Sequence, residues 1–431
     1  GLTMARKMKD SGIEWIGEIP EGWEVAPLKR FASIQTGNTP TKTSDSNYYA
    51  STGIPWIKPD NLGYSHSISK TSEYLTSEGA LCARIMPPNT VYVCCIGSLG
   101  KVGYSSISCA CNQQINALIF NDLMFWKYGY YLTIAQESQY LLFGNGNVLQ
   151  IINSTSQGNI ACVLPPLENQ HLIACYLDSV CSDIEVLISK TRSSIEEYKK
   201  LKQAVITQAV TKGVRGEREM KNSGNPWFGQ IPTDWKLSRV GLHFSIILGK
   251  MLCNAPLNDT YTLEPYYCAA DVHFDGVADG ERKKMWFSPI EKDLYRVSVG
   301  DLLVVEGGAG AGGSAIVENQ DSYTYIQNSI MIVRSKGNAD NRYLRYLLEF
   351  LVKQGYIDVV CNKATIPHFT KDKLSCVPFC LCGEQEEIAD YLDAKCAKID
   401  GLIAKKEQLI KELESYKKSL IYEVVTGKRE V

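Results

Sequence analysis

The stretch MKDSGIEWIGEIP at residues 8–20 decides the architecture, because it returns as MKNSGNPWFGQIP at residues 220–232. A tryptophan follows each copy, Trp23 after the first and Trp235 after the second, which sets an offset of 212 residues. Self-similarity at a fixed offset is the sequence signature of a repeated architecture. The chain is therefore predicted to consist of two halves that share one plan.

A second repeated motif lies toward the end of each half. The tripeptide YLD occurs at residues 176–178 and again at residues 391–393, at an offset of 215 residues. A mixed region rich in Gly, Asn, Tyr and Thr precedes each echo, and a proline-containing hinge separates the two. Four segments are therefore expected: mixed, helical, mixed and helical. Their predicted bounds are 8–165, 166–213, 214–377 and 378–428.

The two Lys- and Glu-rich segments carry residues at alternating steps of three and four, a spacing typical of a coiled-coil seam. The predicted seam of the first segment is Leu177, Val180, Ile184, Leu187, Thr191, Ser194, Tyr198, Leu201 and Val205. The predicted seam of the second is Leu392, Lys395, Ile399, Leu402, Lys406, Leu409, Leu413, Tyr416 and Leu420. At 1.5 Å per residue, each helix is expected to run roughly 60 Å.

The mixed regions combine short β-rich runs with helical stretches, which predicts α+β domains. The β-rich runs are 90–96, 115–120, 301–305 and 329–333, and the helical stretches are 124–139 and 342–353. Between the halves, residues 97–100 align with 307–310, and residues 112–115 align with 327–330. The glycine-rich stretch 307–313 does not lead into an amphipathic helix, so a turn between strands is favoured over a phosphate-binding loop.

The composition is that of a folded protein with more than one domain. The 431 residues exceed the roughly 250–300 at which a single core stops growing. Apolar residues make up 45% and no run of ~18 of them suggests a membrane span. A net charge of −2 argues against a protein that coats nucleic acid alone, but it allows a basic face. The fifteen cysteines lack paired C-x2-C spacing and are interpreted as reduced, buried thiols.

No catalytic constellation is found in the sequence. The five histidines are scattered without metal-ligand spacing, and neither a G-x-S-x-G elbow nor a G-x-x-x-x-G-K-[ST] loop occurs. We therefore expect no catalytic residue, no metal site and no cofactor in this chain.

The doubled order of domain and long helix resembles the specificity subunits of type I restriction–modification systems, over about residues 8–428. The residues that carry the resemblance are Ile19-Pro20 with Trp23, Ile231-Pro232 with Trp235, and the segments 163–170, 176–178, 377–378, 384–385, 388–389 and 391–393. The resemblance implies an α+β fold, with two pseudo-symmetric α+β target-recognition domains separated by two long helices that form an antiparallel coiled coil.

The same resemblance implies the partners. The chain would read a split, asymmetric site in double-stranded DNA. Two adenine methyltransferase subunits would dock on the long helices, and restriction (translocase) subunits would join the full complex. S-adenosylmethionine, ATP and magnesium would bind those partners, since this chain lacks the [DNS]-P-P-[YFW] tetrad of such methyltransferases. The expected location is the prokaryotic cytoplasm, with no membrane partner.

Polar residues in loops between the predicted elements are the candidates for DNA contact, because bases are read through their edges by amide, hydroxyl and basic side chains. In the first domain they are Thr36, Asn38, Thr39, Lys58, Asn61, Ser98, Lys101, Gln113, Gln114, Asn145 and Asn147. In the second they are Lys250, His273, Lys283, Lys284, Gln327, Asn328, Asn362 and Lys363. For any one of them, a solvated turn is the competing interpretation.

Two other classes of function compete with DNA recognition. A coiled-coil scaffold that organises proteins without meeting DNA would share the long helices, and only sequence-dependent, salt-sensitive DNA binding separates the two. An enzyme would require activity from the isolated chain.

Overall fold

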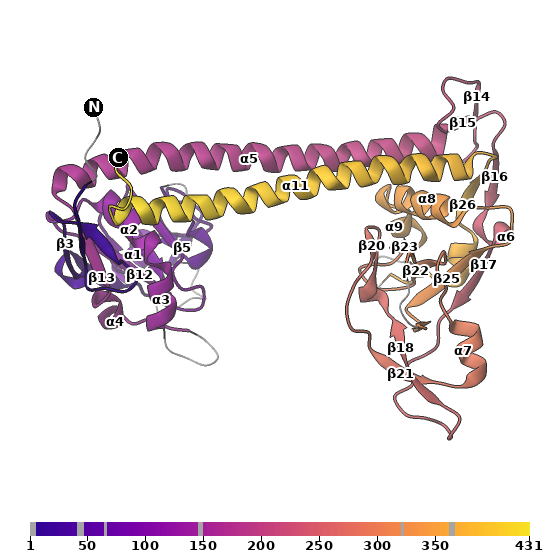
Figure 1. The fold of residues 1–431 in the computed structure, drawn as a ribbon, viewed down its shortest axis with the longest axis horizontal. Coiled ribbons are helices and arrows are strands. Elements are labelled where there is room, and N and C mark those ends of the chain that lie inside the picture. The colour runs from indigo at the N-terminus through magenta and orange to yellow at the C-terminus, as the bar shows by residue number, and fades with distance from the viewer. Residues whose placement is uncertain (1–5, 41–46, 64–66, 145–149, 320–322, 362–366) are drawn as a thin grey trace. The chain divides into compact units, whose positions relative to one another are not determined.

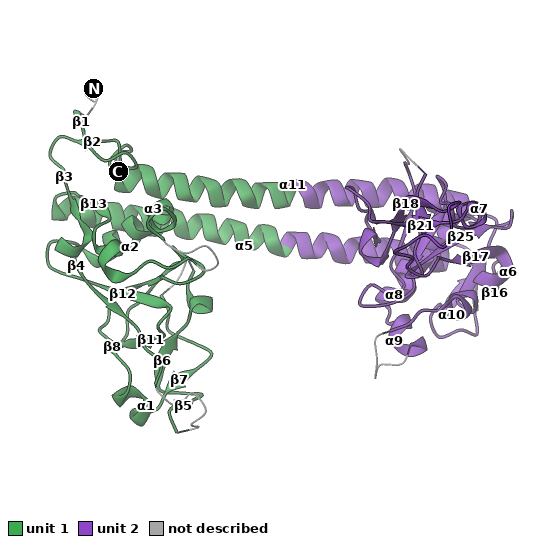
Figure 2. Cartoon of the chain, turned by 90° about the horizontal axis from the view of Figure 1, so that it is seen from below, with its two compact units in different colours: residues 1–193, 406–431 green, residues 194–405 purple. Residues whose placement is uncertain are grey.

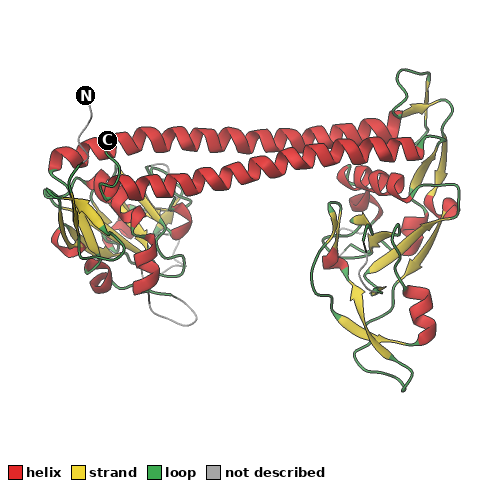
Figure 3. Ribbon diagram, viewed as in Figure 1, coloured by secondary structure: helices red, strands yellow, loops and turns green. Residues whose placement is uncertain are grey.

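The computed structural model describes residues 6–40, 47–63, 67–144, 150–319, 323–361 and 367–431 (Figure 1). The chain divides into two compact units, the first of Gly1–Ser193 with Lys406–Val431 and the second of Ser194–Lys405 (Figure 2). Each unit combines a β-rich region with one end of each long helix, as the colouring by secondary structure shows (Figure 3). This organisation confirms the α+β class expected from the sequence.

The repeated stretch forms a hairpin at the start of each β-rich region. Strand β1 (Met8–Asp10) pairs with β2 (Glu18–Pro20), and β14 (Met220–Asn222) pairs with β15 (Gln230–Pro232). The register is the same in both hairpins, with the methionine of the first strand opposite the proline of the second. The repeated sequence therefore forms the same local structure in both halves.

Two sheets build the β-rich region of the first unit. One is antiparallel with strand order β10-β9-β12-β4, and the other has the order β5-β7-β6-β11-β8, with β6 and β11 parallel. Buried Tyr92 and Ile115 of the first sheet share one core with Ile57 and Cys109 of the second. The bounds are β3 (Glu24–Pro27), β4 (Ala32–Thr36), β5 (Tyr49–Ala50), β6 (Ile54–Ile57), β7 (Tyr74–Leu75), β8 (Ile85–Met86), β9 (Thr90–Cys94), β10 (Val102–Ser105), β11 (Cys109–Cys111), β12 (Ile115–Phe120) and β13 (Ala161–Leu164).

The second unit repeats this plan. Its four-stranded antiparallel sheet has the order β17-β25-β22-β23, and a second sheet has the order β21-β18-β24, with β18 and β24 parallel. Strands β22 and β23 are antiparallel neighbours, so the glycine-rich stretch between them is a turn, as expected. The bounds are β16 (Lys236–Arg239), β17 (Phe244–Leu248), β18 (Thr262–Tyr267), β19 (Val272–His273), β20 (Gly276–Val277), β21 (Lys284–Phe287), β22 (Leu302–Val305), β23 (Ser314–Ile316), β24 (Tyr325–Ile326), β25 (Ile330–Ser335) and β26 (Pro378–Leu381).

Shorter helices cover the sheets. In α8 the side chain of Asp340 accepts the free N–H groups of Arg342 and Tyr343, which is the usual way to cap a helix start. The short helices of the first unit are α1 (Ser77–Leu81), α2 (Trp126–Ala135), α3 (Glu137–Phe143) and α4 (Ser154–Gly158). Those of the second are α6 (Val240–His243), α7 (Pro289–Tyr295), α8 (Asn341–Lys353), α9 (Tyr356–Val360) and α10 (Lys371–Ser375).

Two long helices, α5 (Leu167–Lys212) and α11 (Gln385–Val425), pair antiparallel within each unit. In the first unit, Arg192 of α5 forms an ion pair of 3.0 Å with Glu414 of α11. In the second unit, Lys202 lies 2.7 Å from Asp400. Residue numbers that rise along α5 meet numbers that fall along α11, so the antiparallel coiled coil is confirmed.

The packed seam of these helices differs from the predicted one. Leu187 and Leu201 are exposed by 46% and 48%, whereas Ile188 and Ile195 are buried. The sequence offers two adjacent apolar residues at 187–188, and a pattern alone cannot decide which of them faces the partner helix.

The same correction applies to α11. Leu409 and Tyr416 are exposed, and Ile410 and Lys417 take their places in the seam. Buried Lys417 is tolerated there because its ammonium forms an ion pair with Glu185 of α5.

The fifteen cysteines are all free thiols, and most of them are buried. Burial raises the pKa of Cys95 and Cys111 to about 12, so both thiols are protonated at neutral pH. Among the described helices, none combines the length and the apolar character that crossing a membrane requires.

Candidate nucleic-acid interface

In the first unit, two parallel strands carry polar residues to one edge. Strands β6 and β11 align Trp56 with Ala110 and Ile57 with Cys111. Beyond their ends, the N–H of Asn112 donates to the carbonyl of Ile57 at 3.0 Å. Because parallel strands end at the same edge, the segments that begin at residues 58 and 112 lie side by side.

Two further strands of the first unit end at the same place. The N–H of Gly37, which follows β4, donates to the carbonyl of Ile115 at 3.0 Å. The N–H of Cys95, which follows β9, donates to the carbonyl of Gln114 at 2.8 Å. Residues 36–39, 58–61, 95–98 and 112–114 together form what we call the first rim.

The approach of Gly37 to the rim backbone is too close for any side chain. A Cβ atom at this position would stand 2.3 Å from the carbonyl oxygen of Cys111. Glycine is therefore required by the close packing of two backbones. The same is true of Gly249, whose Cβ atom would stand 2.3 Å from the carbonyl oxygen of Gln327.

The second unit contains the corresponding backbone hydrogen bonds. The N–H of Gln327, after β24, donates to the carbonyl of Tyr267, at the end of β18, at 3.1 Å. The N–H of Gly249 donates to the carbonyl of Ile330 at 3.0 Å. Residues 249–250, 268–271, 306–308 and 327–329 form what we call the second rim.

The hydrogen bonds decide which residues of the two rims correspond. They confirm the predicted match of residues 112–115 with 327–330. They shift the match of residues 97–100 with 307–310 by one position. The N–H of Gly97 donates to the carbonyl of residue 150 and the N–H of Gly308 donates to the carbonyl of residue 367, so Gly97 corresponds to Gly308. Both glycines have positive φ, 83° and 87°. Two adjacent glycines at 307–308 made the sequence alignment ambiguous.

The predicted contacts Thr36, Asn38, Thr39 and Gln113 are brought together in the first rim. The hydroxyl of Thr39 donates to the side-chain oxygen of Gln113. The hydroxyl of Thr36 donates to the side-chain oxygen of Asn116 at 2.8 Å, which aligns β4 with β12. Gln113 is exposed, whereas Thr36, Asn38 and Thr39 are half-buried.

Lys58, Asn61 and Gln114 belong to the same rim. The ammonium of Lys58 lies 2.8 Å from a carboxylate oxygen of Glu73, and the side chain of Asn61 accepts the Lys58 N–H at 2.9 Å. The side-chain oxygen of Gln114 accepts from the amide of Asn112 at 3.0 Å. These bonds orient the side chains while leaving part of each one accessible.

Ser98 is the last residue of the rim segment 95–98, and Lys101 lies just beyond it; both are exposed in the turn between β9 and β10. Four other predicted contacts lie outside the described residues, namely Asn145, Asn147, Asn362 and Lys363.

The side chain of Lys250 in the second rim is largely buried. Its side chain is 10% exposed, and its ammonium lies 2.6 Å from Glu291 and 2.8 Å from the carbonyl oxygen of Trp286. Burial would raise the pKa of Glu291, but the bonds from Lys250 and from Ser288 outweigh it and lower that pKa. In this structure Lys250 supports the rim from within.

The other predicted residues of the second unit that the structure describes are at least partly accessible. Gln327 and Asn328 are half-buried and bonded to each other through their side chains. His273 is exposed in the β19–β20 hairpin, two residues after the rim segment 268–271. Lys283 and Lys284 are exposed beside the end of β18, where Lys284 lies opposite Pro265.

Sequence reasoning did not single out two charged residues that the structure places at the rims. Arg84 is tied to the first rim, because its N–H donates to the side-chain oxygen of Asn38 at 2.9 Å. Glu306 lies in the second rim, where its N–H donates to the carbonyl of Ser329 at 2.8 Å. A signal for Arg84 exists: it is the only arginine between Arg30 and Arg192. Glu306 has no comparable signal.

Comparison with known proteins connects this geometry to a family. The model for the type I restriction modification DNA specificity domain matches residues 20–197. The chain is 27% identical to the MjaX type I restriction enzyme specificity subunit of Methanocaldococcus jannaschii, over 96% of this chain and 95% of that protein.

Two solved structures share the fold. A chain from a structure that explains complex assembly and conformational transition of a type I restriction–modification system has a TM-score of 0.73 at 16% identity, covering 95% of this chain and 99% of that one. The HsdS subunit from Thermoanaerobacter tengcongensis has a TM-score of 0.52 at 16% identity, covering 95% of this chain and 98% of that one.

The chain belongs to the specificity subunits of type I restriction–modification systems. Such subunits are the non-catalytic part of the complex and carry no cofactor of their own.

The aspartate of each YLD echo fixes a β-rich region of this specificity subunit to a long helix. In the first unit, Asp178 of α5 accepts the hydroxyl of Tyr131 at 2.7 Å and forms an ion pair with Lys127. In the second, Asp393 of α11 accepts the hydroxyl of Tyr346 at 2.7 Å. Burial and the carboxylate raise the pKa of both tyrosines, so each remains a hydrogen-bond donor.

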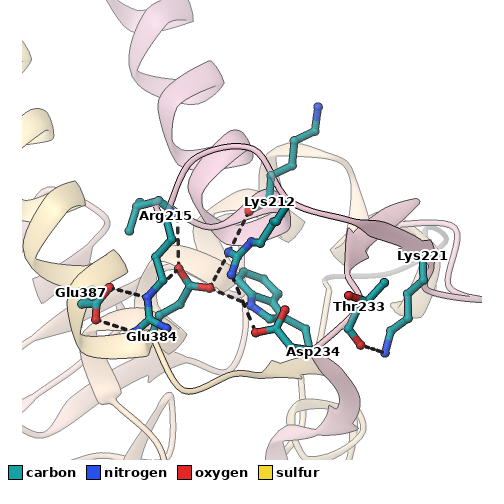
Figure 4. A network of polar contacts seen from close by, with 10 residues as sticks. Lys212, Arg215, Lys221, Thr233, Asp234, Glu384 and Glu387 are labelled. Atoms are coloured by element: carbon teal, nitrogen blue, oxygen red, sulfur yellow. Dashed lines mark hydrogen bonds and ion pairs between the residues drawn. The ribbon is translucent and has the colours of Figure 1, made fainter.

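A second attachment in this specificity subunit surrounds Glu384, just before α11 (Figure 4). One carboxylate oxygen accepts from the guanidinium of Arg218 and, at 2.9 Å, from the indole N–H of Trp235. Glu384 is only 2% exposed, so this ion pair is a buried one. Gly213 makes room for it, because a Cβ atom there would stand 1.8 Å from the Arg218 guanidinium.

Replacing Gly37 by alanine tests the first rim. The added methyl cannot coexist with the Cys111 carbonyl, so we expect a loss of about 1–3 kcal/mol in unfolding free energy, measured by thermal and urea unfolding. Gly22→Ala is the matched control, because nothing lies within 4 Å of its Cβ position. Equal stability of the two variants would show that the rim backbones are not packed as described.

Proposed function

We propose that this specificity subunit reads a split target in double-stranded DNA, with one half-site contacted by each rim. The observation that carries the proposal is the repetition of one backbone frame with different side chains. In each rim four strands end at one edge. Hydrogen bonds hold amide, hydroxyl and charged groups in place there. A rigid scaffold that presents such groups is suited to reading base edges in the major groove.

The two half-sites are expected to differ in sequence. At corresponding positions, where the same backbone-to-side-chain bond is made, the first rim carries half-buried Lys58 and Asn61, and the second carries half-buried Cys268 and Asp271. An amide both donates and accepts hydrogen bonds, whereas a carboxylate accepts them, for example from the amino group of cytosine. An asymmetric target follows from this difference.

We further propose that two adenine methyltransferase subunits dock on α5 and α11, in a complex located in the prokaryotic cytoplasm. Apolar side chains outside the packed seam support this proposal, since Leu187, Leu201, Leu409 and Tyr416 are exposed by 39–48%. Restriction subunits complete the assembly, and S-adenosylmethionine, ATP and magnesium bind to these partners. The recognition domains comprise residues 8–165 and 214–377, and the spacer helices comprise residues 166–213 and 378–428.

The test is to map methylated adenine genome-wide in cells that express the chain with its methyltransferase subunits. We expect one bipartite motif with two different halves, which disappears when this chain is deleted. DNA binding by the purified complex should depend on sequence and weaken with salt. Methylation that continues unchanged without the chain would overturn the proposal and favour a scaffold that does not meet DNA.

The isolated chain is expected to bind S-adenosylmethionine negligibly and to methylate no DNA, because cofactor and chemistry belong to the partners. Titration calorimetry on the purified chain measures this directly. The methyltransferase subunit alone serves as the positive control. Stoichiometric, tight binding to the isolated chain would contradict this division of roles.

A further inference from the structure

Arg84 is a charged residue held at the first rim by two hydrogen bonds. The backbone N–H of Arg84 donates to the side-chain oxygen of Asn38 at 2.9 Å, and Nη1 of its guanidinium donates to the carbonyl of Thr36 at 2.6 Å. Both partners flank Gly37, whose backbone is packed against residues 111–112. The backbone of Arg84 and one nitrogen of its guanidinium are therefore held beside the closely packed backbone at Gly37.

Among the described residues, the Arg84 side chain makes no hydrogen bond other than the one from Nη1 to Thr36. The residue is exposed and takes part in no ion pair within the described residues. Other arginines of the described chain, such as Arg192, Arg334 and Arg342, each have a carboxylate partner. A guanidinium has five N–H donors, of which the Thr36 carbonyl uses one. Enough donors remain for a second, two-pronged contact.

We infer that Arg84 is a specificity-determining residue that reads a guanine in the half-site of the first rim. Two N–H groups of a guanidinium match the N7 and O6 acceptors of guanine in the major groove, and this is the commonest specific contact between proteins and DNA bases. The anchoring by Thr36 fixes the plane of the fork before DNA arrives, which limits the entropy lost on contact. The inference rests on the proposed function.

The second rim offers no arginine at the corresponding position. Ile85 pairs with Ala110 in the first unit, and Arg296 pairs with Tyr325 in the second, so Arg84 corresponds to Tyr295. The neighbouring Arg296 is instead stacked on Tyr323, with its guanidinium carbon 3.6 Å from the ring centroid. We therefore expect the guanine contact from this position at the half-site that the first rim reads.

The experiment compares the wild-type complex with its Arg84→Gln and Arg84→Lys variants on a DNA library in which every position of the target is varied. With Arg84→Gln we expect discrimination to relax on the order of 10- to 100-fold at one G·C pair of one half-site, with the other positions unchanged. Arg84→Lys keeps the charge and should fall between wild type and glutamine at that same pair. Arg30→Gln, an exposed arginine of the same unit outside the rim, is the matched control and should change nothing.

Other outcomes overturn the inference. An equal loss of affinity for all sequences, with a shallower salt dependence, would identify Arg84 as a phosphate contact. An equal loss accompanied by a lower melting temperature would make Arg84 a structural residue of the rim. Unchanged specificity would also overturn it. If the wild-type complex itself shows no sequence preference, the proposed function fails before the variants are compared, so the two failures are distinguishable.

Discussion

Exchanging residues 19–165 for the matching region of another specificity subunit is expected to change one half of the DNA target completely and to leave the other half intact. The first β-rich region has its own core, in which Ile57, Tyr92 and Ile115 are buried together. The second has a separate core around Leu303 and Ile332. Because the two cores share no residue, the replacement of one leaves the side chains of the other rim in place.

The measurement is the sequence of methylated sites in cells that express the hybrid subunit with its methyltransferase. The reciprocal hybrid, which retains residues 19–165 and replaces the second region, is the control and should change the opposite half. If both halves changed in either hybrid, the two rims would not be independent readers.

Replacing Glu384 by alanine is expected to destabilise the second unit by about 3–5 kcal/mol, the typical cost of breaking a buried ion pair. The substitution leaves the Arg218 guanidinium and the Trp235 indole without their acceptor at a buried position, because the Glu384 side chain is 1% exposed. The measurement is the free energy of unfolding from urea titration.

Glu387→Ala is the matched control for this prediction. Glu387 also pairs with an arginine, Arg215, but the pair is exposed and screened by solvent, so we expect little change in stability. A Glu384→Gln variant retains an acceptor for Trp235 and should lose less stability than alanine. Equal stability of the Glu384 and Glu387 variants would show that burial does not strengthen the Glu384 network.

The sequence by itself determined the duplication, because the similar stretches 8–20 and 220–232 fold into hairpins of the same register. It also determined the two long helices and the family. These features depend on local patterns, namely the three-and-four spacing, the turn glycines and the repeated YLD tripeptide. Several DNA-contact candidates were also predicted as residues of loops, and the structure gathers Thr36, Asn38 and Gln113 into one rim.

Only the tertiary structure decided what depends on packing between distant segments. The choice of Ile188 over Leu187 in the seam is made by the partner helix, since both residues satisfy the apolar pattern. The inward engagement of Lys250 is decided by Glu291, which lies 41 residues away. The place of Arg84 at the rim is decided by Thr36 and Asn38, which belong to a different strand and its end. Such contacts join residues that are remote in sequence, and no local spacing encodes the distance between them.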